Sequence, residues 1–228
     1  VRALKMHGGV AKSDLGSENL DALGKGLPNL LRHVSNIVDV YKLPCVVAIN
    51  RFPTDTDAEI SLLSEKCAEK GVNVVLSTVW AEGGKGGEAL AREVVRLCEE
   101  EKGDFTFSYD ADLPLDEKIE AVVTKIYRGA GVNILPAARR QLDEIAALGF
   151  GDLPVCIAKT QYSFSDDPSA LGAPDNFVVT VRSARVSAGA GFVVVLTGDI
   201  LTMPGLPLKP AAENVDVDTD TGRITGLF

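Results

Sequence analysis

The sequence predicts an α/β fold of three layers, in which a mainly parallel sheet lies between flanking helices and a smaller α+β region follows. Two short apolar runs, at 46–49 and 72–76, are each followed by a polar loop and then by apolar residues at helical spacing. After Gly103 the pattern changes, and two longer strands follow one another directly near the C-terminal end. We therefore place a soft boundary between an α/β region, 1–103, and an α+β region, 104–228, which fold separately or as one unit.

The composition excludes several classes of protein. With 228 residues, 46% of them hydrophobic, the chain can bury a sizeable core. A formal net charge of −9 argues against a nucleic-acid partner, because phosphate binding requires clustered Lys and Arg. No apolar run approaches the roughly 18 residues that span a bilayer, so we expect no membrane segment and no membrane partner. The four cysteines form no Cys-x-x-Cys pair, which favours buried free thiols in a reducing cytoplasm over a zinc site or disulfides.

The N-terminal part predicts a strand, a turn and a helix. Val1–Lys5 is expected to be a strand, and His7-Gly8-Gly9 a turn. Gly26-Leu27-Pro28 predicts the start of a helix, because Pro is favoured in the first helical turn, and Pro44 ends it. His33 lies off the apolar face of this helix, which favours a solvated or rim position over a ligand role. That face is formed by Leu30, Leu31, Val34, Ile37, Val38 and Tyr41.

The stretch 46–60 predicts a strand that feeds a helix through a polar loop. Its β-branched apolar residues indicate a strand covered on both faces. Ligands of open parallel sheets bind beyond the carboxyl ends of the strands, so Asn50–Asp57 are expected at a ligand-binding edge. Asp55 or Thr56 can cap the helix that follows, which we expect from Asp55 to Lys70, with Gly71 as its stop.

A second strand and loop repeat this arrangement. Val72–Leu76 predicts the strand, Ser77–Gly87 the glycine-rich loop, and Glu88–Glu101 a helix whose inward residues are Leu90, Val94 and Leu97. The order strand, helix, strand is typical of a βαβ unit, so both loops should emerge at one edge of the sheet.

The C-terminal half predicts two further helices and three strands. The expected helices are 116–127 and 136–148, and the expected strands are 153–159, 177–187 and 191–196. Ala188–Gly191 is expected to connect the last two strands as a hairpin-type turn.

One motif suggests nucleotide chemistry but departs from it. Asn50-Arg51-Phe52-Pro53 after an apolar strand resembles the Asn-Lys-x-Asp motif by which GTPases bind guanine. Arg51 replaces the Lys, and Pro53 cannot supply the carboxylate that bonds the base. No Gly-x-x-x-x-Gly-Lys-Ser/Thr stretch occurs in these residues either, so a nucleotide hydrolase of the P-loop class is only an alternative.

Two aromatic side chains follow neighbouring strands and suggest a stacking site. Phe52 and Trp80, the only tryptophan, each come just after a strand end. Their faces can stack on a flat heterocycle, or both rings can simply pack under loops.

Six runs along the chain closely resemble formate–tetrahydrofolate ligases, also called formyltetrahydrofolate synthetases. They are spread over nearly the whole chain, which makes the resemblance specific. The runs are Ala48–Thr56, Trp80–Gly87, Tyr127–Ala130, Ala158–Ser165, Ser187–Phe192 and Thr202–Pro207.

The resemblance implies an ATP-dependent ligase of one-carbon metabolism. In that family ATP activates formate to formyl phosphate, and tetrahydrofolate then takes the formyl group to give 10-formyltetrahydrofolate. The positions that match the family's pterin sandwich are Phe52 and Trp80, and Leu76 matches an apolar wall. The implied small molecules are formate, tetrahydrofolate, ATP and Mg²⁺, without a prosthetic group, and the complete enzyme is implied to be a homo-oligomer. Because the family's phosphate-binding loop lies upstream, we expect a C-terminal part of the enzyme that is inactive alone.

Several residues are weaker candidates for nucleotide contacts. Asn50, Pro53 and Asp55 follow the first strand, and Asp55 with Asp57 could help hold Mg²⁺, although helix capping explains these two equally well. Gly189 and Gly191 offer bare backbone to adenine or phosphates, or form a tight strand connection. Lys159, Gln161 and Tyr162 follow another strand and are expected to line the cleft. No metal ligands or catalytic residues are assigned, and a non-catalytic binding or oligomerisation module is the remaining alternative.

Overall fold

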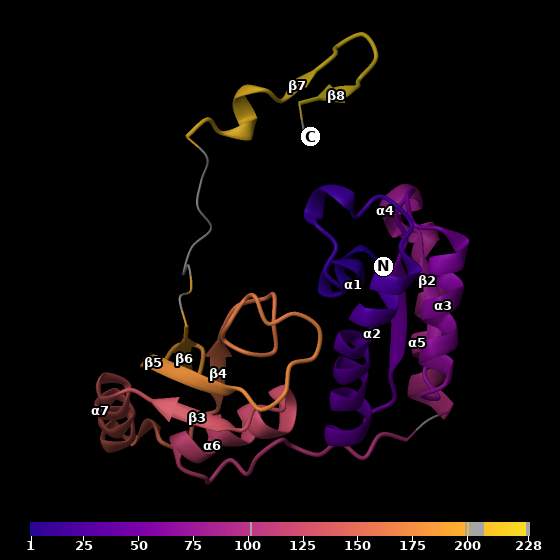
Figure 1. Ribbon diagram of the computed structural model, residues 1–228. Coiled ribbons are helices and arrows are strands. Elements are labelled where there is room, and N and C mark those ends of the chain that lie inside the picture. Colours follow the sequence, from indigo (N-terminus) through magenta and orange to yellow (C-terminus); the bar gives the residue numbers. More distant parts are fainter. Residues whose placement is uncertain (101, 199, 201–207, 227–228) are drawn as a thin grey trace. The chain divides into compact units, whose positions relative to one another are not determined.

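The computed structural model describes residues 1–100, 102–198, 200 and 208–226 (Figure 1). It forms two compact units, Val1–Gly198 and Asp199–Phe228. The first unit has two hydrophobic cores, one built before Gly103 in the sequence and one after it. The predicted α/β class is confirmed, with parallel strand pairs flanked by helices. Within the described ranges, no helix combines the length and the apolar character that crossing a membrane requires.

The first core surrounds a parallel βαβ unit. Strands β1 and β2 pair in parallel, from Val46 opposite Asn73 to Asn50 opposite Ser77, and α3 connects them. Helices α3 and α5 pack against this strand pair (Figure 1). The elements of this part are α1 (Arg2–His7), α2 (Leu20–Ser35), β1 (Val46–Asn50), α3 (Asp57–Ala68), β2 (Asn73–Ser77), α4 (Val79–Glu82) and α5 (Glu88–Glu100).

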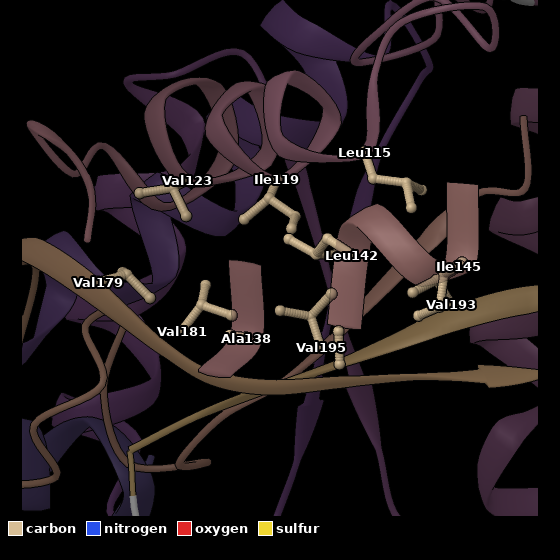
Figure 2. Close-up of a cluster of buried hydrophobic side chains, with 11 residues drawn as sticks. Leu115, Ile119, Val123, Ala138, Leu142, Ile145, Val179, Val181, Val193 and Val195 are labelled. Carbon is tan, nitrogen blue, oxygen red and sulfur yellow. The ribbon is translucent and has the colours of Figure 1, made fainter. Parts of the chain in front are cut away.

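The second core lies between a four-stranded sheet and two helices. The strand order is β3-β5-β6-β4, in which the outer pairs are parallel and the central pair β5–β6 is antiparallel. Figure 2 shows apolar side chains from α6, α7, β5 and β6 meeting in this core. The elements are α6 (Leu115–Val122), β3 (Gly131–Ile134), α7 (Pro136–Ile145), β4 (Val155–Ala158), β5 (Val178–Ser187) and β6 (Phe192–Thr197).

The predicted N-terminal strand is wrong, because Arg2–His7 forms helix α1. Val1 and Leu4, three positions apart, both pack in the first core, which is the spacing of one helix face. Leu4 and Lys5 are neighbours in the sequence, and both are buried. In a strand, neighbouring side chains point to opposite faces, so a single covered face could not bury both of them. Gly8 and Gly9 form the predicted turn, and Gly9 has a φ of +95°.

Helix α2 begins at Leu20, well before the predicted start at Gly26. The Asn19 side chain accepts a hydrogen bond from the backbone N–H of Ala22 (2.9 Å) and caps the first turn. Pro28 therefore lies inside the helix, where it supplies no N–H to the preceding turn. The buried residues Leu23 and Leu27 extend the apolar face before Pro28, and their packing outweighs the lost hydrogen bond.

Other predictions need smaller corrections. Strand β1 buries Val47 and Ile49 but leaves Ala48 exposed, so only one of its faces is covered. Val94 on α5 is exposed rather than inward, whereas Leu97 is buried as predicted. Strand β3 was not predicted, because four residues that start with Gly131 carry little strand signal.

The cysteines are all free, as predicted, but most are not buried. Cys67 is buried in the first core, whereas Cys98 and Cys156 are exposed. Thiols at exposed positions need no apolar partner, so the expectation of buried thiols holds for Cys67 alone.

The second unit contains a short antiparallel hairpin. Strands β7 (Asp216–Val217) and β8 (Ile224–Thr225) pair after the turn η6 (Ala211–Glu213). The whole run Thr202–Pro207, which carries part of the family resemblance, lies outside the described residues.

Candidate functional site

The carboxyl ends of β1 and β2 bring the two predicted site loops to one edge. Asn50 and Ser77 are the last residues of these strands and lie opposite each other. The backbone N–H of Arg51 donates to the carbonyl of Ser77 (3.1 Å), which continues the pairing one residue beyond β1. Both loops therefore leave the sheet side by side, as the βαβ arrangement predicts.

A tight turn from Phe52 to Asp55 presents the Phe52 ring. The N–H of Asp55 donates to the carbonyl of Phe52 (3.0 Å), and the N–H of Phe52 donates to Asp55 Oδ2 (2.9 Å). Pro53 occupies the second position of this turn, for which its fixed φ is suited. Asp55 is buried, and among the described residues its Oδ1 has no hydrogen-bond partner.

Thr56, rather than Asp55, caps helix α3. Thr56 Oγ1 accepts from the N–H of Glu59 (3.3 Å), and Glu59 Oε2 accepts from the N–H of Thr56 (3.2 Å), which completes a capping box. The sequence left both residues open as caps. The structure gives Asp55 a different role, since its carboxylate holds the Phe52 turn.

Glu59 also joins three helices behind the site. Its Oε1 lies 2.8 Å from Lys5 Nζ and accepts from the backbone N–H of Asn19 (3.0 Å). Burial raises the pKa of the Glu59 carboxyl, but the hydrogen bonds from Lys5, Asn19 and Thr56 outweigh it and hold that pKa below its ordinary value. The carboxylate is thus charged at neutral pH and fixes the start of α3.

The loop after β2 presents Trp80 on the single turn α4. The N–H of Thr78 donates to the carbonyl of Gly86 (3.1 Å), and Thr78 Oγ1 donates to Glu82 (2.7 Å). A side chain at Gly86 would lie 2.5 Å from the carbonyl carbon of Thr78, so the loop closes only around glycine. Trp80 projects from this closed loop with 62% of its surface exposed.

Phe52 and Trp80 face one another at the strand edge. Their ring centroids lie 6.1 Å apart, and the ring planes are inclined by 39°. Two parallel rings that hold a flat heterocycle between them need about 7 Å, or roughly 3.5 Å of contact distance on each side. The observed pair is therefore partly closed, and rotation of the exposed Trp80 ring would open it.

Arg2 is a neighbour of the pair that the sequence did not predict. Its guanidinium carbon lies 5.1 Å from the centroid of the Phe52 ring, within the range of a cation–π contact. Arg2 and Lys5 both come from α1, which the sequence placed in a strand. The signal available in the sequence was their spacing of three residues, which places two side chains on the same face of a helix.

The remaining predicted site residues are not all brought together. Leu76 belongs to β2 and packs against the first core, and Asn50 is exposed at the end of β1. Gly189 and Gly191 lie in the hairpin between β5 and β6, which belongs to the other sheet. Gly191 has a φ of +75°, which accounts for a glycine in that connection.

The carboxylates near the site do not form a metal cluster. Asp57 is exposed and forms an ion pair with Arg51 (2.9 Å), whereas Asp55 is buried in the turn. Across the part of the chain that the structure describes, no group of three or more His, Cys, Asp or Glu side chains could hold a metal ion.

The half-buried Phe52 and the exposed Trp80 thus lie beside one another beyond the ends of parallel strands in an α/β fold, where ligands of open parallel sheets bind. The family model described as formate–tetrahydrofolate ligase matches residues 1–228. The chain therefore belongs to the formate–tetrahydrofolate ligase family, whose enzymes use tetrahydrofolate and ATP. The resemblance inferred from the six sequence runs is confirmed.

Proposed function

We propose that this chain forms the tetrahydrofolate-binding side of an ATP-dependent formate–tetrahydrofolate ligase. In this proposal Phe52 and Trp80 stack on the two faces of the pterin, and Leu76 provides an apolar wall. The observation that carries the assignment is the proximity of the Phe52 and Trp80 rings, 6.1 Å between centroids, beyond neighbouring strand ends.

The hydrogen bonds that hold the loops of Phe52 and Trp80 favour a preorganised site. Asp55 fixes the turn of Phe52, and the Thr78–Gly86 bond closes the loop of Trp80. Because its loop is closed, the backbone that carries Trp80 loses little conformational entropy when a ligand binds. Stacking between the two rings would also exclude water from one end of the substrate.

In the proposed reaction, a formate oxygen attacks the terminal phosphorus of ATP, which gives formyl phosphate and ADP. N10 of tetrahydrofolate then attacks the formyl carbon, the bond from that carbon to the phosphate oxygen breaks, and the N10 proton is lost. The products are 10-formyltetrahydrofolate and phosphate. The contribution of this chain is to hold the pterin so that N10 meets the formyl group in one orientation.

In the same proposal, ATP meets the predicted residues Asn50, Pro53 and Asp55 at this edge, while Gly189 and Gly191 remain predicted nucleotide contacts in the β5–β6 hairpin, outside this edge. Asn50 is an exposed polar side chain two residues before Phe52, and Asp55 Oδ1 is an acceptor without a partner among the described residues. Mg²⁺ enters this proposal with ATP, as part of the co-substrate.

Residues 1–228 contain no Gly-x-x-x-x-Gly-Lys-Ser/Thr stretch, and in this proposal the groups that bind the ATP phosphates during activation of formate lie outside these residues. We accordingly expect the isolated chain to bind tetrahydrofolate without catalysing ligation. A coupled assay with formate, ATP and tetrahydrofolate tests this, and ordinary ligase turnover by the isolated chain would refute it.

Calorimetric titration of the chain with tetrahydrofolate tests the stacking assignment. Trp80→Leu and Phe52→Leu should each weaken binding by about ten- to a hundredfold, since each removes one stacking face. Phe107→Leu is the matched control, because Phe107 is an exposed aromatic residue (76%) that follows no strand of the β1–β2 pair. Equal affinities for all four proteins would show that the pterin lies elsewhere.

A further inference from the structure

A second polar pocket lies in the first unit, apart from the Phe52–Trp80 edge. It has a volume of about 170 Å³ and is lined by α1, α2, the helical turns before Arg128, and the segment after β4. Its lining includes His7, Asn36, Tyr127, Lys159 and Ser163. At about 30 Å³ for each water molecule, this volume holds roughly five waters or one small ion with its remaining hydration.

The pocket contains a cation, Lys159, but no carboxylate among the described residues that line it. Lys159 Nζ lies 5.1 Å from the centre of the Tyr127 ring. It donates to the carbonyl oxygens of Thr160 (3.0 Å) and Ser163, and its third contact, to the carbonyl of Ser165, is long at 3.5 Å. Burial lowers the pKa of the Lys159 ammonium to about 8, so the group still carries a charge at neutral pH.

No acidic side chain is found within the described residues of the lining, and the Asp166 carboxylate, which raises the pKa of Lys159 by its charge, lies outside that lining. This is unusual in a chain with 32 Asp and Glu residues against 23 Lys and Arg. Instead His7 and His33 share the lining with Lys159. Arg32, which forms an ion pair with Asp175 (2.8 Å), stacks over the lining residue Phe164 (5.1 Å). A half-buried ammonium with no carboxylate in the lining of its pocket favours an anionic ligand.

Asn36 adds an acceptor without a partner to the lining of the same pocket. Its Nδ2 donates to the carbonyl of Ile126 (2.9 Å), which fixes the orientation of the amide. Its Oδ1 is therefore an acceptor, and among the described residues it has no partner, although Asn36 is only 5% exposed. A buried acceptor without a donor costs free energy, and a ligand O–H would recover it.

His7 adds a donor to the same pocket. Its Nδ1 accepts from the backbone N–H of Gly172 (3.1 Å), so in the neutral ring the proton is on Nε2. The pocket thus offers N–H donors and one orphan acceptor.

We propose that this pocket binds a small oxyanion that carries an O–H group, of the size of hydrogen phosphate. The anionic oxygens face Lys159 and His7, and the O–H donates to Asn36 Oδ1. Sulfate has the same shape and no proton at neutral pH, so it lacks the donor that Asn36 requires. The ligand is either free phosphate or the terminal phosphate of a larger molecule, and the two share this chemistry.

Calorimetric titration of the chain tests the proposal with inorganic phosphate, sulfate and glycerol phosphate at matched ionic strength. We expect one phosphate-type anion to bind per chain, with sulfate at least about tenfold weaker. Tighter binding of glycerol phosphate than of inorganic phosphate would identify a larger ligand of the same class. Equal binding of phosphate and sulfate, or no saturable binding of either phosphate form, would overturn the proposal.

Two variants test where the anion binds, so the result does not depend on the correct folding of a single mutant. Lys159→Met should abolish saturable phosphate binding, and Asn36→Leu should remove the preference for phosphate over sulfate. Trp80→Leu is the control that separates this pocket from the proposed folate site, because it should leave phosphate binding unchanged. Phosphate affinity that survives Lys159→Met in a protein with a native circular dichroism spectrum would contradict the assignment.

Discussion

Lys5 Nζ and Glu59 Oε1 lie 2.8 Å apart, and both side chains are completely buried. Lys5 also donates to the carbonyl of Ser17 (2.9 Å), while Glu59 accepts from the backbone of Asn19 and Thr56. One ion pair therefore connects α1 with the starts of α2 and α3. Phe52 lies on the turn that leads directly into α3, so the same pair supports the candidate site.

Breaking this ion pair from one side should destabilise the chain strongly. Glu59→Leu or Lys5→Met leaves a buried charge without its partner, and the free energy of unfolding should fall by about 3–5 kcal/mol. The double variant should lose less than the sum of the two single losses, because no charge is then left alone. Urea unfolding measures all four proteins, and additive losses would show that the pair is not coupled.

The pH dependence of stability should report Glu59. Its pKa in the folded chain lies below the ordinary value of 4.5, so the folded state binds this proton less readily than the unfolded state. The stabilisation is complete above about pH 4.5 and is lost as the pH falls through the lower folded pKa. The difference in unfolding free energy between wild type and Glu59→Gln should therefore shrink below pH 4.5. A difference that stays constant down to pH 3 would contradict this.

Gly86 should be irreplaceable in the Trp80 loop, whereas Gly84 should not. A Cβ at Gly86 would lie 2.5 Å from the Thr78 carbonyl carbon, but a Cβ at Gly84 meets no atom within 4 Å. Gly86→Ala should cost about 1–3 kcal/mol and shift the Trp80 fluorescence spectrum, because the loop must open. Gly84→Ala should stay within about 0.5 kcal/mol of wild type. Similar spectra for both variants would mean that the Thr78–Gly86 contact does not hold the loop.

A second glycine pair tests the packing of α1 on α2. A Cβ at Gly26 would lie 1.8 Å from the carbonyl oxygen of Leu4, whereas a Cβ at Gly24 meets nothing within 4 Å. Gly26→Ala should destabilise by about 3 kcal/mol or more, because backbone cannot yield as a side chain does. Gly24→Ala should stabilise by up to about 1 kcal/mol, since Ala is the better helix former. Thermal unfolding of both variants provides the measurement, and equal melting temperatures would disprove close packing at Gly26.

The sequence predicted the βαβ unit because its signals are local. Apolar runs, the cap at Thr56 and the stop at Gly71 each act within a few residues, and the structure confirms the elements that they delimit. Helix α1 was missed because six residues with three apolar positions, Ala3, Leu4 and Met6, fit a strand as well as a helix. The early start of α2 was missed because the Asn19 cap is a single side-chain contact.

The sequence predicted the parts of the candidate site that depend on the order of the strands. It did not predict the parts that depend on side-chain contacts between distant segments. Phe52 and Trp80 follow strands of one parallel pair, so their proximity followed from the order of elements. Arg2 and the Lys5–Glu59 pair come from distant segments that meet only in the folded chain. Likewise, the orphan acceptor of Asn36 depends on the bond of its amide to Ile126, which no local pattern encodes.

The most direct test of the folate assignment uses Trp80 itself, because it is the only tryptophan in the chain. Tetrahydrofolate is added to the chain while tryptophan fluorescence is recorded, with Phe52→Leu as the second protein. The proposal predicts saturable quenching in wild type, with a midpoint about ten- to a hundredfold higher in Phe52→Leu. Unchanged tryptophan fluorescence at saturating tetrahydrofolate, after correction for absorption by the ligand, would contradict it.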